Sequence, residues 1–209
     1  MEKLGEIVER IRTNFDAKNA ARDLALRRSR ELIRHCANTI RATHRAEFDR
    51  AAELLLTARQ AAAEMVNGVQ DYPDLYYAGY TQDALKEFVE ANATFALITD
   101  APLPAPEELN VEYAAYLNGL AEAASELRRH ILDIIRHGHS GRAEHLLGYM
   151  DDIYGYLVTV DFPDAITGRL RRTTDMLRAV LERTRGDLTT SLRQTQLQAA
   201  LQSLEEKLS

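Results

Sequence analysis

The sequence has few of the residues that interrupt or cross-link a chain. Its 209 residues include one cysteine, no tryptophan, five prolines and ten glycines. The single cysteine, Cys36, excludes an intrachain disulfide and a cysteine-rich zinc site, and it favours a reducing, intracellular setting. Turns between strands usually need proline or glycine, so a sequence with so few of them is expected to contain few strands. We therefore expect long helices and a cytoplasmic location.

Long apolar runs are also absent from the sequence. Stretches such as residues 95–98 are much shorter than the roughly 20 residues that a membrane-spanning helix needs. Residues 1–14 mix charged and spaced apolar side chains, which is not the pattern of a signal peptide. Charged residues of both signs make up 28% of the chain, with 32 acids against 26 bases and a net charge of -6. This balance excludes a disordered chain, and we expect no contact with a membrane.

Apolar residues recur at intervals of three and four along almost the whole chain, which predicts helices and no strands. The expected helices cover residues 3–41, 46–66, 73–99, 111–136, 140–160 and 163–208. A proline-rich segment, residues 100–106, is the one clear break, and Asn110 is expected to cap the helix after it. The sequence predicts an all-α fold: a single-domain bundle of about six or seven helices over residues 1–209, with long first and last helices.

Four glutamates have a spacing that points to chemistry. Glu87 and Glu90 lie three residues apart, and Glu122 and Glu126 lie four apart, so each pair shares one face of its helix. Apolar residues surround both pairs, which indicates partly buried faces. The two helices are joined by a short proline-rich loop and should pack antiparallel, so the pairs could face each other.

Four convergent carboxylates repel one another unless a cation lies between them. Hard divalent ions such as Mg2+ or Mn2+ prefer oxygen ligands of this kind, and such ions assist phosphodiester cleavage. The simpler alternative is that these are surface glutamates paired with Lys86, Arg128 and Arg129. From spacing alone this alternative is favoured, because glutamate pairs at helical spacing are common.

Basic and aromatic residues offer further candidates. Residues 22–45 contain seven arginines against two acids, which could hold phosphates in a local groove of an otherwise acidic protein. Arg128 and Arg129 follow the second glutamate pair and could reach a phosphate. A solvated charged face is the commoner explanation for such clusters. Tyr72, Tyr76, Tyr77 and Tyr80 form a band that could stack on bases, although tyrosines at the edge of a core are commoner.

Three segments of the sequence resemble the translin family. Residues 26–33 (LRRSRELI), followed by Ile40 and His44-Arg45, resemble its first helix. Residues 85–91 (LKEFVEA) resemble the acidic motif of the translin-associated factor X (TRAX) branch, and residues 116–128 (YLNGLAEAASELR) resemble its second motif. The resemblance extends over nearly the whole chain, in a compact form similar to prokaryotic or archaeal relatives.

The resemblance implies a Mg2+-dependent endoribonuclease that cleaves single-stranded RNA within a homo-oligomer, with duplex RNA and single-stranded DNA as further possible ligands. It implies that Glu87, Glu90, Glu122 and Glu126 are the catalytic and metal-binding residues. At position 122 the TRAX pattern has aspartate, so this chain departs from it by one methylene. The family forms hollow octamers, so we expect an octamer with arginines facing the RNA. The expected RNA-binding residues are Arg27, Arg30, Arg34, Arg41, Arg45, Arg128 and Arg129.

Three alternatives remain open at this point. The first is a translin-like protein that binds single-stranded RNA or DNA without cleaving it, and the acidic quartet argues against it. The second is an all-α nucleotide pyrophosphohydrolase, in which the second acidic pair is Glu-x-x-Asp, whereas here it is Glu-x-x-x-Glu. The third is a di-iron bundle, which is disfavoured because Glu-x-x-His motifs are absent.

Overall fold

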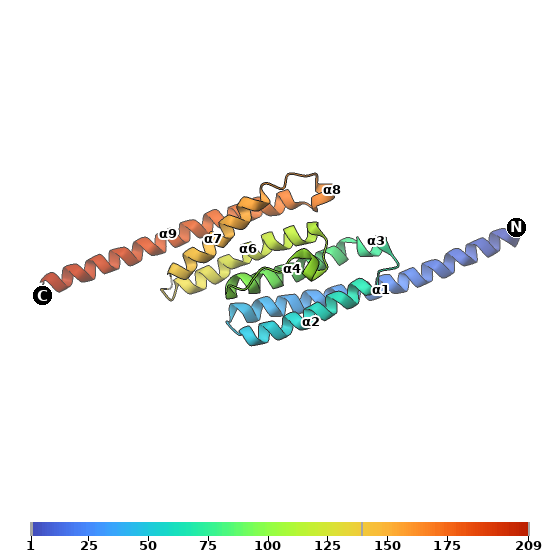
Figure 1. Cartoon of the computed structure of the whole chain (residues 1–209), viewed down its shortest axis with the longest axis horizontal. Coiled ribbons are helices and arrows are strands. Elements are labelled where there is room, and N and C mark those ends of the chain that lie inside the picture. Colours follow the sequence, from blue (N-terminus) through green and yellow to red (C-terminus); the bar gives the residue numbers. More distant parts are fainter. Residues whose placement is uncertain (1, 139, 209) are drawn as a thin grey trace. The chain divides into compact units, whose positions relative to one another are not determined.

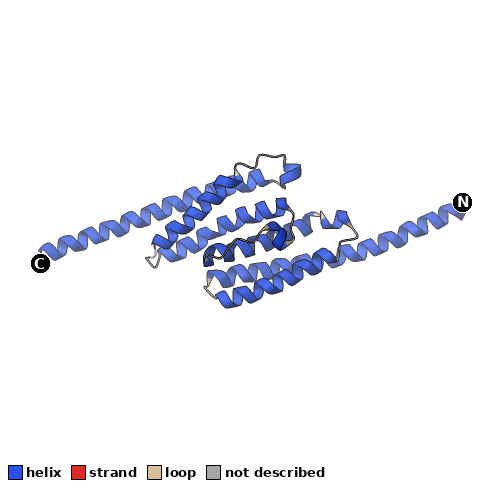
Figure 2. Ribbon diagram, viewed as in Figure 1, coloured by secondary structure: helices blue, strands red, loops and turns tan. Residues whose placement is uncertain are grey.

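The structure, a computed structural model, describes residues 2–138 and 140–208. Within these residues every regular element is a helix, as Figure 2 shows. In chain order (Figure 1) the helices are α1 (Glu2–His44), α2 (Phe48–Asn67), α3 (Pro73–Tyr76), α4 (Gly79–Thr99), α5 (Pro106–Leu109), α6 (Tyr113–Ile135), α7 (Ser140–Leu157), α8 (Asp164–Thr167) and α9 (Leu170–Leu208). The all-α prediction is confirmed, including the long first and last helices.

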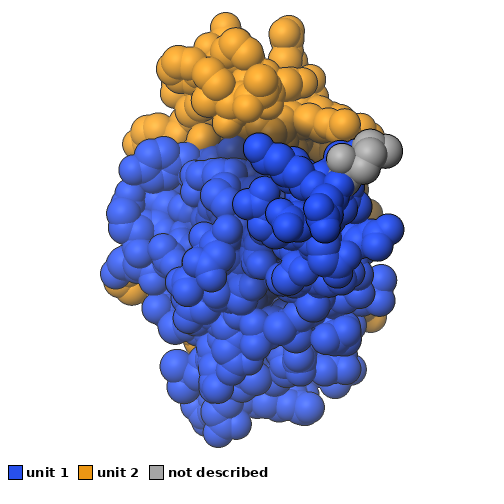
Figure 3. Space-filling view, turned by 90° about the vertical axis from the view of Figure 1, so that its right-hand side faces the viewer, with its two compact units in different colours: residues 1–92, 105–116 blue, residues 93–104, 117–209 orange. Residues whose placement is uncertain are grey.

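The chain divides into two compact units, which Figure 3 distinguishes by colour. Unit 1 comprises residues 1–92 and 105–116, and unit 2 comprises residues 93–104 and 117–209. The division falls inside α4 and inside α6, so each of these helices contributes residues to both units. That the whole chain forms one domain stays a prediction.

A hairpin of α1 and α2 forms much of unit 1. The buried residues of α1 repeat at alternating intervals of four and three, which is the spacing of a helix that packs along one seam. They are Ala25, Ser29, Leu32, Cys36, Thr39 and Thr43, and Ala42 beside this seam is buried as well. The hydroxyl groups of Thr39 and Thr43 donate hydrogen bonds to carbonyls one turn earlier, at 3.0 and 2.9 Å, so their burial leaves no hydroxyl unsatisfied. The partner face of α2 is made of Ala51, Ala58, Ala62 and Met65.

The core of unit 2 combines the end of α4 with α6, α7 and α9. Ala93 and Leu97 of α4 belong to the same buried cluster as Ala121 and Ala124 of α6. The three alanines among them allow close approach of two helix backbones. Larger residues complete the core, among them Leu127, Ile131, Leu146, Met150, Leu177 and Leu181. The structure therefore fixes the second half of α4 against α6 through unit 2's own core.

Residues 77 and 78 separate α3 from α4, whereas the sequence pattern predicted one helix over 73–99. At this break the Thr81 hydroxyl donates to the Leu75 carbonyl at 2.8 Å, and the Gln82 amide donates to the Tyr76 carbonyl at 2.9 Å. Side chains thus satisfy carbonyls that an unbroken helix would satisfy with backbone N–H groups. The prediction of one continuous helix was wrong for this reason.

Left-handed residues set two other boundaries that the sequence prediction misplaced. Asn110 has φ 53° and ψ 53° and ends the single turn α5, so it does not cap α6, which begins at Tyr113. Gly168 (φ 59°) and Arg169 (φ 69°) end α8. The last long helix therefore begins at Leu170 rather than near Pro163, because a right-handed helix cannot pass through left-handed residues.

Asp100 ends α4 in the same way, with φ 56°, and its carboxylate is held by α7. Arg142 donates two hydrogen bonds to the Asp100 carboxylate, at 2.9 and 2.7 Å, and one to the Ile98 carbonyl at 2.7 Å. Tyr149 Oη donates to the same carboxylate at 3.1 Å. These donors, Arg142 first, hold the pKa of Asp100 below its usual value. Arg142 thereby links the end of α4 to α7 within unit 2.

Replacing Asp100 by Asn should lower the melting temperature at pH 7 by a few degrees at most, since the group is half exposed. Asparagine tolerates the left-handed backbone, so the change removes mainly the charged hydrogen bonds. Because folding depresses the pKa of Asp100, its contribution is present above about pH 4 and is lost as the pH falls through the folded-state value. Thermal melts of the wild type and Asp100→Asn should therefore converge at acidic pH. A gap that stays constant from pH 7 to pH 3, or an equal effect of Asp152→Asn, would contradict this.

Candidate metal and RNA-binding site

Glu87 and Glu90 lie on α4 among fully buried neighbours. Phe88 and Val89 are 1% and 0% exposed and belong to the core of unit 1. The two glutamates are half-buried, as their apolar surroundings predicted. A side chain at either position is therefore anchored by the residues next to it, and neither carboxylate is freely solvated.

The negative charges of Glu87 and Glu90 affect the pKa of Cys36 on α1. Burial raises the pKa of the Cys36 thiol strongly, and the charges of Glu87 and then Glu90 raise it further. A thiolate would be both desolvated and repelled at this place. Cys36 is therefore a packed, protonated thiol and does not serve as a nucleophile in this region of unit 1.

Glu122 and Glu126 lie on α6 and are also half-buried. Their neighbours Ala121, Ala123 and Ala124 are completely buried in the core of unit 2. The helix face that carries the two glutamates is thus fixed by packing on either side of it. This agrees with the prediction from sequence that both acidic pairs lie on partly buried faces.

Carboxylate oxygens of Glu87, Glu90 and Glu122 lie within 4.8 Å of one another, and all three residues are half-buried. Among the described residues this group is the one whose His, Cys, Asp and Glu side chains meet the requirement for holding a metal ion. Glu126, the fourth predicted residue, is not a member of the group. A group of three carboxylates fits a hard divalent cation, which takes oxygen ligands and keeps several waters.

The alternative pairing of these glutamates with nearby cations is met only in part. Lys86 Nζ lies 3.7 Å from Glu87 Oε1. Arg128 is engaged elsewhere in unit 2, since it contacts the Asp187 carboxylate at 2.7 Å and donates to the Thr184 hydroxyl at 3.2 Å. Lys86 therefore fits this alternative at Glu87, and Arg128 pairs with Asp187.

Four of the predicted RNA-binding arginines, Arg27, Arg30, Arg34 and Arg41, form one stripe on α1, and Arg45 directly follows the end of this helix. The four follow one another at intervals of three, four and seven residues, which keeps them on one side of the helix axis. All five are exposed. Arg34 lies 3.5 Å from Glu31 and Arg41 donates to the Asn38 side chain, both within α1. These exposed contacts are weak, so the stripe stays available to an anionic ligand.

A second basic surface lies on α6 in unit 2. Arg128, Arg129 and Arg136 line an open cavity of about 620 Å3 together with Ser125, Leu132, Asp133 and Val180. The sequence prediction included the first two arginines and missed Arg136. Arg136 directly follows the last residue of α6, seven residues after Arg129, and this spacing was the signal that could have found it.

No helix in the described parts of the chain is both long enough and apolar enough to cross a membrane. This agrees with the short apolar runs of the sequence.

None of the protein-family models matches this chain. An uncharacterized protein of Methanocaldococcus jannaschii is 29% identical over 193 residues, which cover 92% of this chain and 86% of that protein. Among solved structures, AfC3PO in complex with duplex RNA is 32% identical, with a TM-score of 0.82 over 88% of this chain and 95% of that chain. The crystal structure of apo-NeC3PO is 19% identical, with a TM-score of 0.80 over 88% and 96% of the two chains, and it supports the fold alone.

Proposed function

Because the chain belongs to the translin family, we propose that it is a Mg2+- or Mn2+-dependent endoribonuclease that binds RNA and cleaves single strands within a homo-oligomer. The observation that carries this proposal is the group of Glu87, Glu90 and Glu122 on α4 and α6. Binding alone gives no reason to gather three carboxylates in a protein that must attract phosphates, because they repel a polyanion. A cation bound by the carboxylates replaces this repulsion with attraction for the phosphates.

The three glutamates would hold the metal ion, and Glu126 would act from the next turn of α6. When bound, a divalent ion lowers the pKa of a water ligand and stabilises charge on the scissile phosphate. The carboxylates position that ion, and their half-buried state limits competition by bulk water. Glu126 lies four residues after Glu122 on the same helix face, where it can accept a proton from water or orient it.

The arginines would supply the binding of the sugar–phosphate chain. The stripe on α1 and the pair Arg128 and Arg129 present exposed or half-exposed guanidinium groups, which bind phosphates without regard to base. The similar protein AfC3PO has been solved with duplex RNA, which supports duplex RNA as a second ligand. Single-stranded DNA offers the same phosphates and is a further ligand on these grounds.

Two exposed apolar stripes support self-association. Leu4, Val8, Ile11 and Phe15 on α1 are between 38% and 64% exposed, and Leu197, Leu201, Leu204 and Leu208 on α9 are between 51% and 80% exposed. Both stripes repeat at intervals of four, three and four residues, which is the spacing of helices that pack along a seam. Other copies of the chain would bury them, and an octamer is the assembly we propose.

Replacing Glu90 or Glu126 by Ala should reduce RNA cleavage in Mg2+ by at least about 100-fold, since each change removes a group from the catalytic set. RNA binding, measured by fluorescence anisotropy in EDTA, should be unchanged or tighter because a negative charge is lost. The exposed Glu53 on α2 gives the matched control, and Glu53→Ala should cleave like the wild type. Cleavage at near wild-type rate by both variants would refute the assignment, and cleavage by neither variant nor wild type would favour the binding-only alternative.

Replacing Arg27 and Arg34 together by Gln should weaken RNA binding for all sequences alike. The slope of log K against log salt should fall by about two for single strands at most, because two phosphate contacts are lost. Arg10 and Arg12 lie on α1 outside the stripe and give the matched double substitution. An unchanged salt slope for Arg27→Gln/Arg34→Gln would mean that the α1 stripe does not contact RNA.

Replacing Leu197 and Leu201 together by Gln should produce smaller particles in solution. Both side chains are more than half exposed in the chain itself, so the substitutions should leave the helical circular dichroism signal unchanged. Light scattering on the wild type should give a mass several times the 23.6 kDa of one chain. A wild-type mass of one chain at micromolar concentration would refute the oligomer.

A further inference from the structure

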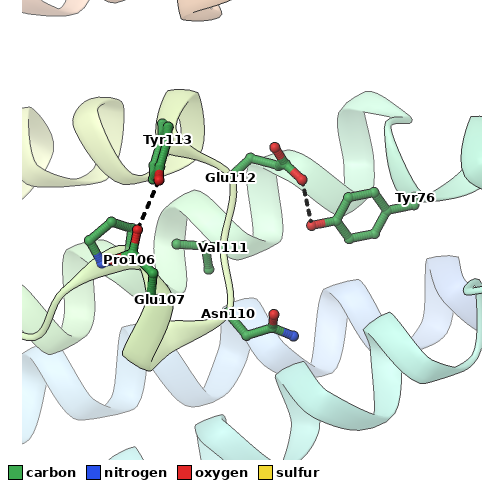
Figure 4. Close-up of a pocket in the computed structure, with 7 residues that line it drawn as sticks. All are labelled: Tyr76, Pro106, Glu107, Asn110, Val111, Glu112 and Tyr113. Atoms are coloured by element: carbon green, nitrogen blue, oxygen red, sulfur yellow. Dashed lines mark hydrogen bonds between the residues drawn. The ribbon is translucent and has the colours of Figure 1, made fainter.

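A small cavity in unit 1, separate from the carboxylate group, is lined by aromatic rings and carboxylates. Its volume is about 240 Å3, and α5, the turn after it and the start of α6 form its walls together with Tyr76 of α3. Figure 4 shows Tyr76 and Tyr113 on opposite sides of the turn, with the Glu107 and Glu112 side chains beside them. Each tyrosine comes from a different helix, so the cavity depends on the folded unit.

Each of the two carboxylates accepts a hydrogen bond from a tyrosine. Tyr113 Oη donates to Glu107 Oε1 at 2.9 Å, and Tyr76 Oη donates to Glu112 Oε1 at 3.1 Å. Tyr77 Oη is a longer third donor to Glu112, at 3.5 Å. Burial, followed by the Glu112 charge, raises the pKa of Tyr76 to about 12. The phenol groups of Tyr76 and Tyr113 therefore stay neutral and donate to the two carboxylates.

In the described part of the chain, no lysine, arginine or histidine lies within 4.0 Å of the Glu107 or Glu112 carboxylate. Arg59 does reach this turn, but it donates to the Glu108 backbone carbonyl, at 3.2 Å. Glu108 has a structural role at the start of α5, where its carboxylate accepts a hydrogen bond from the Ala105 N–H at 2.6 Å. This role at the helix start does not explain why the Glu107 and Glu112 carboxylates point toward the tyrosines.

The walls of the cavity are preorganised. Leu109 and Val111, which flank the left-handed Asn110, are 5% and 9% exposed and belong to the core of unit 1. The Val111 N–H donates to the Pro106 carbonyl at 3.1 Å, which closes the turn. A ligand that enters the cavity therefore meets groups that are already fixed, and little ordering cost opposes its binding.

We propose that this cavity binds an organic cation, an alkylammonium or guanidinium group, between the Glu107 and Glu112 carboxylates and the rings of Tyr76 and Tyr113. Carboxylates pair with the charge, and the negative face of a tyrosine ring attracts a cation that approaches it. An anion, including an RNA phosphate, would be repelled by both glutamates. A metal ion would find few oxygen ligands besides them, because ring faces do not coordinate Mg2+. The cation is either a free polyamine or the side chain of an arginine or lysine in a protein.

Isothermal titration calorimetry on the full chain tests the proposal with two probes: spermidine, and a blocked Gly-Arg-Gly peptide. At least one probe should bind saturably, and which binds more tightly identifies the source of the cation. Glu112→Gln should weaken binding about five-fold or more, and Tyr113→Ala about three-fold. Tyr113→Phe, which keeps the ring, should bind within about two-fold of the wild type.

Two matched variants keep the result specific to this cavity. Glu53→Gln removes one exposed charge on α2, and Glu90→Gln removes one from the proposed metal site. Both should bind the probe as the wild type does, and loss of RNA cleavage in Glu90→Gln would leave this inference untouched. Failure of both probes to bind, equal weakening by Glu112→Gln and Glu53→Gln, or loss of binding in Glu90→Gln alone would each overturn the proposal.

Discussion

The site depends on one unfavourable interaction, the repulsion among the carboxylates of Glu87, Glu90 and Glu122. Oxygens within 4.8 Å of one another raise the free energy of the folded chain unless a cation or a proton offsets their charge. The fold maintains this arrangement with apolar anchors. Phe88 and Val89 hold the first two glutamates on α4, and the buried alanines at 121, 123 and 124 hold the third on α6. Burial of these neighbours stabilises the helices strongly enough to outweigh the local repulsion.

Alanines in the core of unit 2 allow α4 and α6 to pack closely there. Ala93 and Leu97 continue α4 beyond its glutamates and share the core of unit 2 with Ala121 and Ala124 of α6. A larger side chain at 121 or 124 would separate the two helices within that core. Meanwhile the arginines of α1 and of α6 remain exposed or half-exposed. The protein thus keeps an acidic cluster in a partly buried setting and leaves its basic groups accessible, which suits the proposed site, where a metal ion would have to bind before a phosphate could approach.

The sequence predicted the helical class and the long first and last helices because apolar spacing alone determines them. Its errors lie at residues 77–78, Asn110 and Gly168-Arg169, where side chains replace backbone hydrogen bonds or the backbone turns left-handed. The spacing of apolar residues at intervals of three and four does not predict side-chain hydrogen bonds or left-handed residues at a helix boundary. Spacing also pointed to Glu87, Glu90 and Glu122, whose carboxylate oxygens the structure brings within 4.8 Å of one another, and Glu126 is not a member of that group; their role as site residues stays a prediction. Glu122 and Glu126 are one helical turn apart, and this separation places Glu126 outside the group. Residue spacing alone does not show which of the two belongs to it.

Whether Glu87, Glu90 and Glu122 bind a metal ion can be tested by locating the ion itself. Crystals of the protein soaked in Mn2+ would give an anomalous scattering peak at the ion's position. We expect a peak about 2 Å from carboxylate oxygens of Glu87, Glu90 and Glu122, and no peak there in Glu90→Gln. A peak at another group of residues, or none at millimolar Mn2+, would contradict the claim that these three glutamates form a metal site.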